Sequence, residues 1–479
     1  MTLNRRPQPR DTVIRQPRLR DVRPTVAQSA PTRRPRRVFS SPYILLFGFV
    51  MLIVTGGLLL TLPVASNSGG FTPLDVAFFT AVSAITVTGH TVVDTGAHWS
   101  SFGQGVIFFL MLVGGLGFMA VATFLLFLIG QRSSLQERLV MRDTMGTDHM
   151  EGLRRVTLSI LGVVLSIYAL GAAAIFWRIN GIGGMELGES IWQSTFLSVS
   201  AFNNAGFSIL PESAAGTGLA RLGTELGFLG FLTVLIILGG IGWTVLVDVS
   251  RHRRFARLSL DTKLVLVTSL GLWVLGAGTF FLAEYSETLA GISTGDKAVS
   301  SVFHSVSGRT AGFAAVDFGL VDDFTKVTFP ALMFIGGAAG SVAGGIKVAT
   351  FAVIIAAVIS SVRGRSEAEA FGREIAHFQV LRALTVAALG VGFLMVVLPT
   401  LTVTDPDIPF LDLFFDTVSA FGTNGTSTGI VPGLSLPGKI IFMITMFVGR
   451  LGPLTLALAL APREEASVYR FARERVKIG

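Results

Sequence analysis

The feature that most constrains this chain is a series of apolar stretches, each long enough to cross a membrane. A hydrocarbon core of about 30 Å requires roughly 20 residues of helix. The eight clearest stretches begin near Tyr43, Gly105, Leu158, Leu226, Leu264, Phe329, Val380 and Lys439. With 51% hydrophobic and only 14% charged residues, the chain carries more apolar surface than a soluble fold of 479 residues can bury. The sequence therefore predicts an all-α polytopic membrane protein.

Positively charged residues indicate the orientation of the chain in the membrane. Of the 38 Lys and Arg residues, thirty lie in the tail 1–41, in the gaps 131–155, 248–263 and 361–382, and beyond residue 460. Such residues accumulate on the cytoplasmic side. Both termini are therefore predicted to be cytoplasmic, in agreement with an even number of spans. The short loops suit a bacterial inner membrane.

The tail 1–41 holds eleven Arg against two Asp and is poor in apolar residues. A segment of this composition cannot bury enough apolar surface to become ordered, so we expect a disordered basic tail. An arginine-rich arm can bind nucleic acid, but beside a membrane it is better explained as an anchor to anionic lipid headgroups. Membrane lipid, and not nucleic acid, is therefore its expected partner.

One motif occurs four times at a spacing of roughly one hundred residues. Its copies are Ser83–Gly89 (SAITVTG), Ser200–Gly206 (SAFNNAG), Ser307–Gly312 (SGRTAG) and Ser419–Gly425 (SAFGTNG). Each copy follows an amphipathic stretch too short to cross a membrane, such as 75–85 or 411–421, and precedes another apolar span. This pattern predicts four repeats of span, half-helix, glycine loop and span (M1–P-loop–M2). The predicted repeats comprise residues 42–150, 151–258, 259–370 and 371–479.

The four glycine loops predict a shared polar path. Backbone leaves helical geometry at membrane depth only where it is buried in protein or lines water. Four such loops on one chain are therefore expected to converge on a central axis, in a pseudo-fourfold, potassium-channel-like arrangement. Backbone carbonyls and Thr or Asn oxygens can replace the hydration shell of an ion. The negative ends of the half-helix dipoles favour a cation.

At these loops the sequence resembles the superfamily of potassium transporters that includes bacterial Ktr and Trk proteins and fungal and plant Trk/HKT proteins. The resemblance rests on residues 200–207 (SAFNNAGF) and 307–313 (SGRTAGF), and it extends over about residues 40–479. Trk-type bacterial proteins have an extra pair of helices before the first repeat, and this sequence shows no such pair. The sequence is therefore most similar to the Ktr membrane subunit, KtrB.

The resemblance implies a selectivity filter with one glycine from each repeat. The matching residues are Val87, Thr88 and Gly89, then Asn204, Ala205 and Gly206, then Thr310, Ala311 and Gly312, then Thr423, Asn424 and Gly425. Glycine rather than serine in the first repeat is typical of potassium-selective members. A sodium-selective or weakly selective cation channel or transporter of the same fold is the alternative. His90 departs from many relatives, and it is expected either to add a protonatable group at the outer mouth or to hydrogen-bond a neighbouring loop.

The second span of the third repeat predicts a broken helix. Its glycine-rich residues and their polar neighbours are Gly336, Gly337, Gly340, Ser341, Gly344, Gly345 and Lys347. Each glycine costs about 1 kcal/mol relative to Ala in a helix, so this stretch sustains a helix poorly. The alternative is a continuous helix that packs closely through its small residues. The resemblance favours the first interpretation and implies that residues 336–347 act as an intramembrane gate.

Two basic residues accompany this predicted gate. Arg450 lies in an apolar span of the fourth repeat, where a charge costs at least ~2.5 kcal/mol on insertion scales. A cation below a cation filter would repel passing ions, so Arg450 is interpreted as an electrostatic barrier linked to gating, as the resemblance also implies. A purely structural arginine is the alternative. Lys347 either joins this barrier or reaches cytoplasmic water.

Regulation by a nucleotide requires another chain, since the sequence contains no Walker motif and no GxGxxG after a strand. The resemblance implies a homodimer and a cytoplasmic ring of KtrA-like nucleotide-binding regulatory subunits, which we expect at the basic segments 131–155 and 248–263. Potassium is the expected transported ion, sodium is a candidate activator, and no organic cofactor is expected. An enzyme is disfavoured because the six His form no HxxxH or HExxH pair. A transporter of larger solutes would show inverted repeats.

Overall fold

The computed structural model describes residues 41–116, 153–182, 186–210 and 225–452. The predicted tail, most of the segment 131–155 and the C-terminal end lie outside these ranges. The first helices are α1 (Ser41–Thr61), α2 (Leu74–Thr86), α3 (Thr95–His98), α4 (Ser101–Leu116), α7 (Leu153–Ile182), α8 (Leu187–Phe202), α9 (Leu226–Ile241) and α10 (Trp243–Arg251). They are followed by α11 (Leu260–Glu284), α12 (Thr294–Thr310), α13 (Asp323–Phe334), α14 (Val348–Val362), α15 (His377–Thr404), α16 (Phe410–Gly422) and α17 (Leu436–Leu451). Strands β1 (Ala368–Ala370) and β2 (Arg373–Ile375) pair antiparallel.

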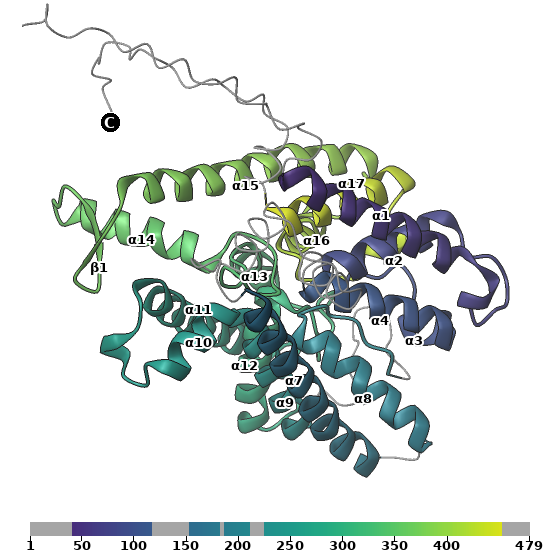
Figure 1. The fold of residues 1–479 in the computed structure, drawn as a ribbon. Coiled ribbons are helices and arrows are strands. Elements are labelled where there is room, and N and C mark those ends of the chain that lie inside the picture. The colour runs from purple at the N-terminus through teal and green to yellow at the C-terminus, as the bar shows by residue number, and fades with distance from the viewer. Residues whose placement is uncertain (1–40, 117–152, 183–185, 211–224, 453–479) are drawn as a thin grey trace, which may run out of the picture. The chain divides into compact units, whose positions relative to one another are not determined.

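Twelve of the described helices are arranged in four groups of three (Figure 1). Helices α1, α2 and α4 pack together, as do α7, α8 and α9, α11, α12 and α13, and α15, α16 and α17. In every group the last helix also packs against the middle helix of the next group: α4 on α8, α9 on α12, α13 on α16 and α17 on α2. The contact of α17 with α2 brings the last group back to the first, so the four groups close a ring.

The outer helices have the length and composition of membrane spans. Among the described residues, three helical stretches qualify: 160–180 within α7, and helices α11 and α15. The bent pair α9 and α10 makes a fourth if it counts as one span, and shorter apolar helices lie in α1, α2, α4 and α14. Leu170, Leu282 and Val403 are 72%, 78% and 80% exposed on these outer helices. The protein is therefore a multi-pass membrane protein, while the total of eight spans stays a prediction.

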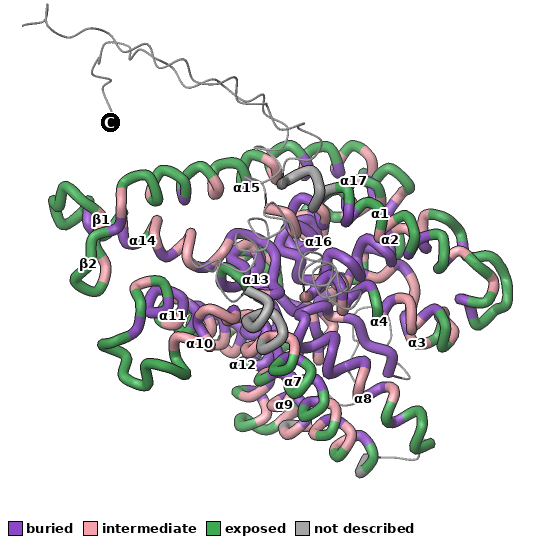
Figure 2. Tube along the Cα trace, in the orientation of Figure 1, coloured by how far each residue is buried: buried purple, intermediate pink, exposed green. Residues whose placement is uncertain are grey.

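The middle helix of each group ends inside the protein (Figure 2). Residues 79–86 of α2, 196–202 of α8, 303–310 of α12 and 415–422 of α16 are all buried. Helices α2 and α16 coincide with the half-helices expected at 75–85 and 411–421, and this prediction is confirmed. The C-terminal ends of these helices carry the four sequence motifs.

The predicted break in the third repeat is present. Helix α13 ends at Phe334 and α14 begins at Val348. Between them, Gly336 N donates to Ile346 O at 2.8 Å and Ile346 N donates to Phe334 O at 3.2 Å, so the two ends of the break pair as in a short parallel bridge. The alternative of a continuous helix packed through small residues is therefore wrong. We call residues 336–347 the break segment.

A second break was not predicted. Helices α9 and α10 meet at an angle of 94° around Gly242. Gly242 has φ +88°, and a Cβ built there would lie 2.9 Å from Ala339 O in the break segment. Only glycine reaches this backbone conformation at low cost. The interruption at Gly242 is therefore tied to a close approach between the second and third groups.

Helices α14 and α15 lie side by side and are joined by the β-hairpin (Figure 1). The predicted boundary between repeats three and four, 370/371, falls in its turn, where Phe371 has φ +50° and Gly372 has φ +71°. Phe371 packs against Phe255 with ring centroids 5.9 Å apart. The hairpin, which the sequence analysis did not predict, therefore contacts the basic segment 248–263.

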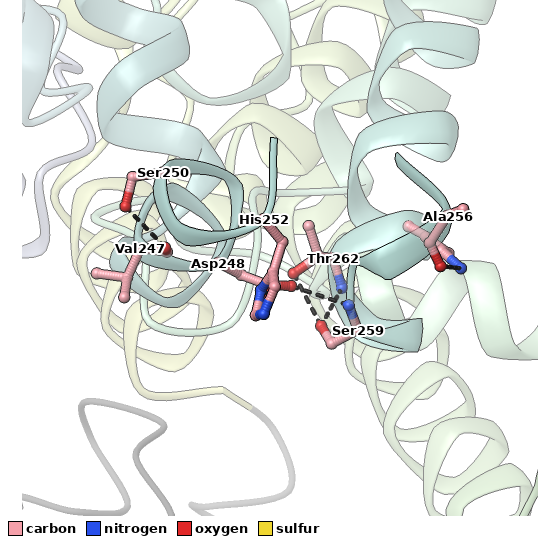
Figure 3. A network of polar contacts seen from close by, with 8 residues as sticks. Val247, Asp248, Ser250, His252, Ala256, Ser259 and Thr262 are labelled. Carbon is pink, nitrogen blue, oxygen red and sulfur yellow. Dashed lines mark hydrogen bonds and ion pairs between the residues drawn. The ribbon is translucent and has the colours of Figure 1, made fainter. Parts of the chain in front are cut away.

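A carboxylate fixes the turn between α10 and α11 (Figure 3). Asp248 lies 2.8 Å from His252 Nδ1 and accepts a hydrogen bond from Ser259 N at 2.9 Å. Ser259 in turn caps α11 by accepting from Thr262 N at 3.2 Å. The basic segment 248–263 is therefore an ordered elbow and not a loose loop.

Candidate ion-conducting site

The four motif glycines share an unusual backbone conformation. Gly89, Gly206, Gly312 and Gly425 have φ values of +92°, +71°, +71° and +91°. Residues with a Cβ rarely adopt this left-handed conformation, so the structure requires glycine at these positions. We call residues 87–89, 204–206, 310–312 and 423–425 the glycine loops.

The first serine of each motif anchors its glycine loop. Ser83 O accepts from Thr88 N at 2.9 Å, and Ser419 O accepts from Asn424 N at 2.9 Å. The carbonyls of Ser200 and Ser307 accept equivalent bonds from the residues before the second and third glycines, at 2.8 Å each. All four serines are at most 1% exposed. The sequence motif contained these serines without a role for them, although a serine five or six residues before every motif glycine was the signal.

The serine hydroxyls divide the loops into two kinds. In the first and fourth loops, the hydroxyls of Ser83 and Ser419 accept from the glycine N–H, both at 3.1 Å. In the second and third loops, the hydroxyls of Ser200 and Ser307 donate to the carbonyl that follows the glycine, at 2.8 and 2.7 Å. The four loops are thus alike in backbone path but not identical in bonding.

The glycine loops contact one another in cyclic order. A Cβ built on Gly206 would lie 2.7 Å from Ala311 O in the third loop. In the same way, a Cβ on Gly312 would overlap Asn424 O, one on Gly425 would overlap Thr88 O, and one on Gly89 would overlap Ala205 O. In every case the neighbour is the carbonyl just before the next glycine. All twelve predicted filter residues therefore lie in one closed ring of loops.

The first residue of three loops is also left-handed although it carries a side chain. Val87, Asn204 and Thr423 have φ values of +57°, +54° and +49°. For β-branched Val and Thr this conformation is strained, at a cost of roughly 1–3 kcal/mol. The third loop escapes the strain because it is one residue shorter, and Thr310 remains helical. There the Thr310 hydroxyl and the Asn204 side-chain amide lie 2.7 Å apart and join the second and third loops.

One expectation placed His90 at the outer mouth of the ion path. The structure places it elsewhere. The residue is 1% exposed, and its ring meets the ring of Phe442 edge-on with centroids 5.9 Å apart. It therefore lies inside the protein behind the first glycine loop, between the first and fourth groups.

The break segment lies against the glycine loops and the last helices of the other groups. Ala338 N donates to Gly240 O at 3.0 Å, and Gly345 N donates to Gly449 O at 3.2 Å. The N–H of Gly344 donates to the Thr423 hydroxyl at 3.1 Å. At the tip of the segment, Gly340 is exposed and has φ +72°. The segment thus lies against the fourth glycine loop and two last helices, with a solvent-facing turn at its tip.

Further contacts fix the remaining residues of the break segment. Ser341 Oγ accepts from Ala343 N at 3.3 Å, and Gly337 O accepts from Val348 N at 3.0 Å. Lys347 is the N-cap residue of α14, and its Nζ donates to Ala343 O. Lys347 therefore turns back onto the break segment and does not extend away from it.

Arg450 connects the break segment to the first group. One guanidinium nitrogen donates to Val342 O in the break segment, and the other donates to Gly114 O in α4. The polar face that the sequence analysis required for this charge is thus made of backbone carbonyls. These bonds place Arg450 beside the break segment, and its role in gating stays a prediction.

Glycines in the last helices of the first, second and fourth groups allow the close approach to the ends of the middle helices. A Cβ on Gly114 would overlap Ile85 O, one on Gly239 would overlap Phe202 O, and one on Gly449 would overlap Phe421 O. Each of these carbonyls belongs to the end of a middle helix. These positions were not predicted, although each of the three glycines begins a Gly-x-x-Gly pattern in the sequence.

Two ion pairs join neighbouring groups at the starts of the middle helices. Lys439 of α17 lies 2.7 Å from Asp75 of α2, and Lys326 of α13 lies 2.9 Å from Asp412 of α16. The hydrogen bond from Lys439 lowers the pKa of the Asp75 carboxyl. Both pairs flank the fourth group, and the first of them secures the closure of the ring.

Comparison with known proteins identifies the family. The family model TrkH, described as a cation transport protein, matches residues 44–469. The Ktr system potassium uptake protein B of Bacillus subtilis is 38% identical over 90% of this chain and 95% of its own length. The potassium/sodium uptake protein NtpJ of Enterococcus hirae is 34% identical over 93% of this chain and 99% of its own.

A solved structure shows the same fold. The potassium transporter TrkH from Vibrio parahaemolyticus superposes with a TM-score of 0.68 at 20% identity, over 90% of this chain and 87% of that one. This family consists of cation transporters and not of enzymes. Because the family model covers nearly all of the apolar region and both relatives align over almost their full lengths, the chain belongs to the TrkH family of cation transport proteins.

Proposed function

We propose that this chain is the ion-translocating membrane subunit of a potassium uptake system, with four repeats in pseudo-fourfold arrangement around one pore. The observation that carries the proposal is the closed ring of glycine loops, in which each glycine faces the carbonyl before the next glycine. A ring of backbone oxygens held at the ends of four buried half-helices suits a dehydrated cation. Potassium is the transported ion, and sodium is a candidate activator.

The choice of potassium rests on the four glycines and on the relatives. All four loops have glycine at the left-handed position, so no side chain narrows the ring there. One relative is named a potassium uptake protein and the other a potassium/sodium uptake protein. The second name keeps a sodium-selective or weakly selective transporter as the alternative.

The break segment is proposed as the gate. It contacts the second, third and fourth groups directly and the first group through Arg450, so a movement of this one segment would affect the whole ring. Lys347 within the segment and Arg450 beside it supply two positive charges. A cation that passes the ring must therefore displace both the segment and its charges.

Regulation is proposed to act from the cytoplasmic side. The elbow 248–263 carries five basic residues and is held in shape by Asp248. Its contact with the β-hairpin offers an ordered surface for a KtrA-like nucleotide-binding ring. We place the chain as a homodimer in a bacterial inner membrane, with both termini in the cytoplasm.

Ion flux into liposomes tests the proposal. Purified protein in liposomes should take up rubidium, a potassium substitute, at least about tenfold faster than sodium from equal concentrations, whereas empty liposomes should take up neither. Sodium uptake equal to rubidium uptake would favour the alternative. No uptake of either ion above empty liposomes, with and without an added regulatory ring, would refute the proposal.

A further inference from the structure

One end of the break segment is hydrogen-bonded to Arg309, at the end of α12 just before the third glycine loop, and the segment near its other end is hydrogen-bonded to Thr423 in the fourth glycine loop. We propose that Thr423 and Arg309 are positioning residues that couple the break segment to the filter, so that the position of the gate changes ion selectivity. This inference rests on the proposed function, since it concerns the same filter and gate. It assigns to Arg309, and to the hydroxyl of Thr423, roles that the sequence motifs alone do not give.

The contact at Thr423 is tight and specific. Gly344 N donates to Thr423 Oγ1 at 3.1 Å, and both residues are buried. A Cβ built on Gly344 would overlap the Thr423 side chain, so the two segments touch without a gap. Because Asn424 follows Thr423 directly, any shift of the Thr423 backbone moves a carbonyl of the ring.

Thr423 is also strained, which makes it sensitive to loss of this contact. A β-branched residue at φ +49° is held there only because its surroundings compensate for the strain. The hydrogen bond from Gly344 is one such compensation. When the break segment moves away, the Thr423 hydroxyl loses this donor, and the fourth glycine loop is free to change its conformation.

Arg309 forms the second link. It lies at the end of α12, one residue before the third glycine loop, and it is 4% exposed. Its Nη2 donates to Gly336 O at 2.8 Å, at the start of the break segment, while its guanidinium lies over the Trp273 ring at 5.6 Å. The break segment is therefore held at Gly336 by the third repeat and near its other end by the fourth.

Coupling of this kind is reciprocal. If the closed segment stabilises the selective conformation of the filter, then a filter in that conformation stabilises the closed segment. Weakening either link should therefore have two effects together. The gate should open more often, and the open pore should discriminate less well between ions.

The test is Thr423→Val, which removes the hydroxyl and keeps the shape. Val87 occupies the equivalent position of the first loop at φ +57°, so this fold accommodates valine there. In liposomes without a regulatory subunit, rubidium uptake should rise about fivefold, as expected for one lost hydrogen bond. The ratio of rubidium to sodium uptake should fall at the same time. Thr423→Ser, which keeps the hydroxyl, should stay close to wild type.

Two further variants keep the test decisive. Thr417→Val removes another buried hydroxyl of α16, one without a hydrogen-bond partner among the described residues, and it should change neither quantity. Gly344→Ala breaks the same contact from the side of the break segment, and it should act like Thr423→Val. This variant decides the matter if the substitution at Thr423 prevents folding.

The outcomes separate this inference from the proposed function. Faster uptake together with lower selectivity in both variants supports the coupling. If wild-type protein prefers rubidium but Thr423→Val and Gly344→Ala leave rate and selectivity unchanged, or lower the rate alone, the coupling is wrong and the proposed function stands. If wild-type protein shows no preference for rubidium, the proposed function fails first and the inference fails with it.

Discussion

Arg450 provides a direct test of the proposed gate. Its guanidinium bonds two carbonyls, Val342 O in the break segment and Gly114 O in the first group. Arg450→Gln removes the charge and at least one of the two bonds while it keeps much of the side-chain volume. If these bonds hold the break segment in place, the variant should conduct more ions than wild type.

The structure allows the size of this effect to be estimated. Two hydrogen bonds from a charged donor contribute about 1.5–3 kcal/mol each. The variant also removes a charge whose burial in a membrane segment costs about 2.5 kcal/mol or more on insertion scales. The closed position of the break segment should therefore lose about 2 kcal/mol of stabilisation in this variant, which corresponds to roughly a 30-fold change in the ratio of open to closed protein. Removal of the electrostatic barrier acts in the same direction.

The assay is rubidium uptake by liposomes without a regulatory subunit, compared at equal amounts of incorporated protein. Arg450→Gln should raise the initial uptake rate by about one order of magnitude or more. Arg450→Lys keeps the charge but cannot donate to both carbonyls in the same geometry, so its uptake rate should lie between those of wild type and Arg450→Gln. An Arg450→Gln protein with wild-type thermal stability and an unchanged or lower uptake rate would refute the role of Arg450 in holding a gate.

Two further predictions concern the packing and closure of the ring. Gly239→Ala should lower the free energy of unfolding by about 1–3 kcal/mol and reduce rubidium uptake, because its new Cβ would overlap Phe202 O just before the second glycine loop. Gly278→Ala on α11, where a Cβ meets nothing within 4 Å, is the matched control and should not destabilise; equal thermal unfolding midpoints for the two variants would contradict the prediction. Asp75→Asn should destabilise the protein by about 1 kcal/mol at pH 7 through loss of the pair with Lys439, and the double variant Asp75→Lys, Lys439→Asp should recover part of this. Because the pKa of Asp75 is lowered in the folded protein, the ion pair contributes its full stabilisation above the usual carboxyl pKa of about 3.9, and this stabilisation is lost as the pH falls through the lowered pKa. The difference in unfolding midpoint between wild type and Asp75→Asn should therefore shrink in acid. A constant difference from pH 7 to pH 3 would argue against the pair.

The sequence predicted the local elements of this fold well. The half-helices at 75–85 and 411–421 and the break at 336–347 depend on short-range signals, namely helix length between turn residues and the density of glycine. The eight spans, the repeat boundaries and the roles of the site residues remain predictions, because they depend on the membrane and on ion binding and not on local helix and glycine signals.

What the sequence did not predict depends on contacts between distant segments. The 94° bend at Gly242 follows from the approach of the break segment, about one hundred residues further along the chain. The anchoring role of Ser83 and its counterparts requires the exact path of each loop, which the motif alone does not specify. His90 was expected to add a protonatable group at the outer mouth or to hydrogen-bond a neighbouring loop, because its position in the sequence says nothing of Phe442, the ring that packs against it.

The central claim is that four glycine loops form one potassium-selective filter, and Gly312→Ser tests it most directly. A side chain at Gly312 would overlap Asn424 O of the fourth loop and adopt a left-handed φ of +71°, at a strain of about 1–2 kcal/mol. The measurement is the initial rate of rubidium and of sodium uptake in liposomes, with Gly278→Ser on the outer helix α11 as the matched control. The account predicts that wild type and Gly278→Ser prefer rubidium, and that Gly312→Ser loses about tenfold or more of both rubidium uptake and preference. Sodium uptake equal to or greater than rubidium uptake in wild type, unchanged by Gly312→Ser, would contradict the filter and favour a sodium transporter of the same fold.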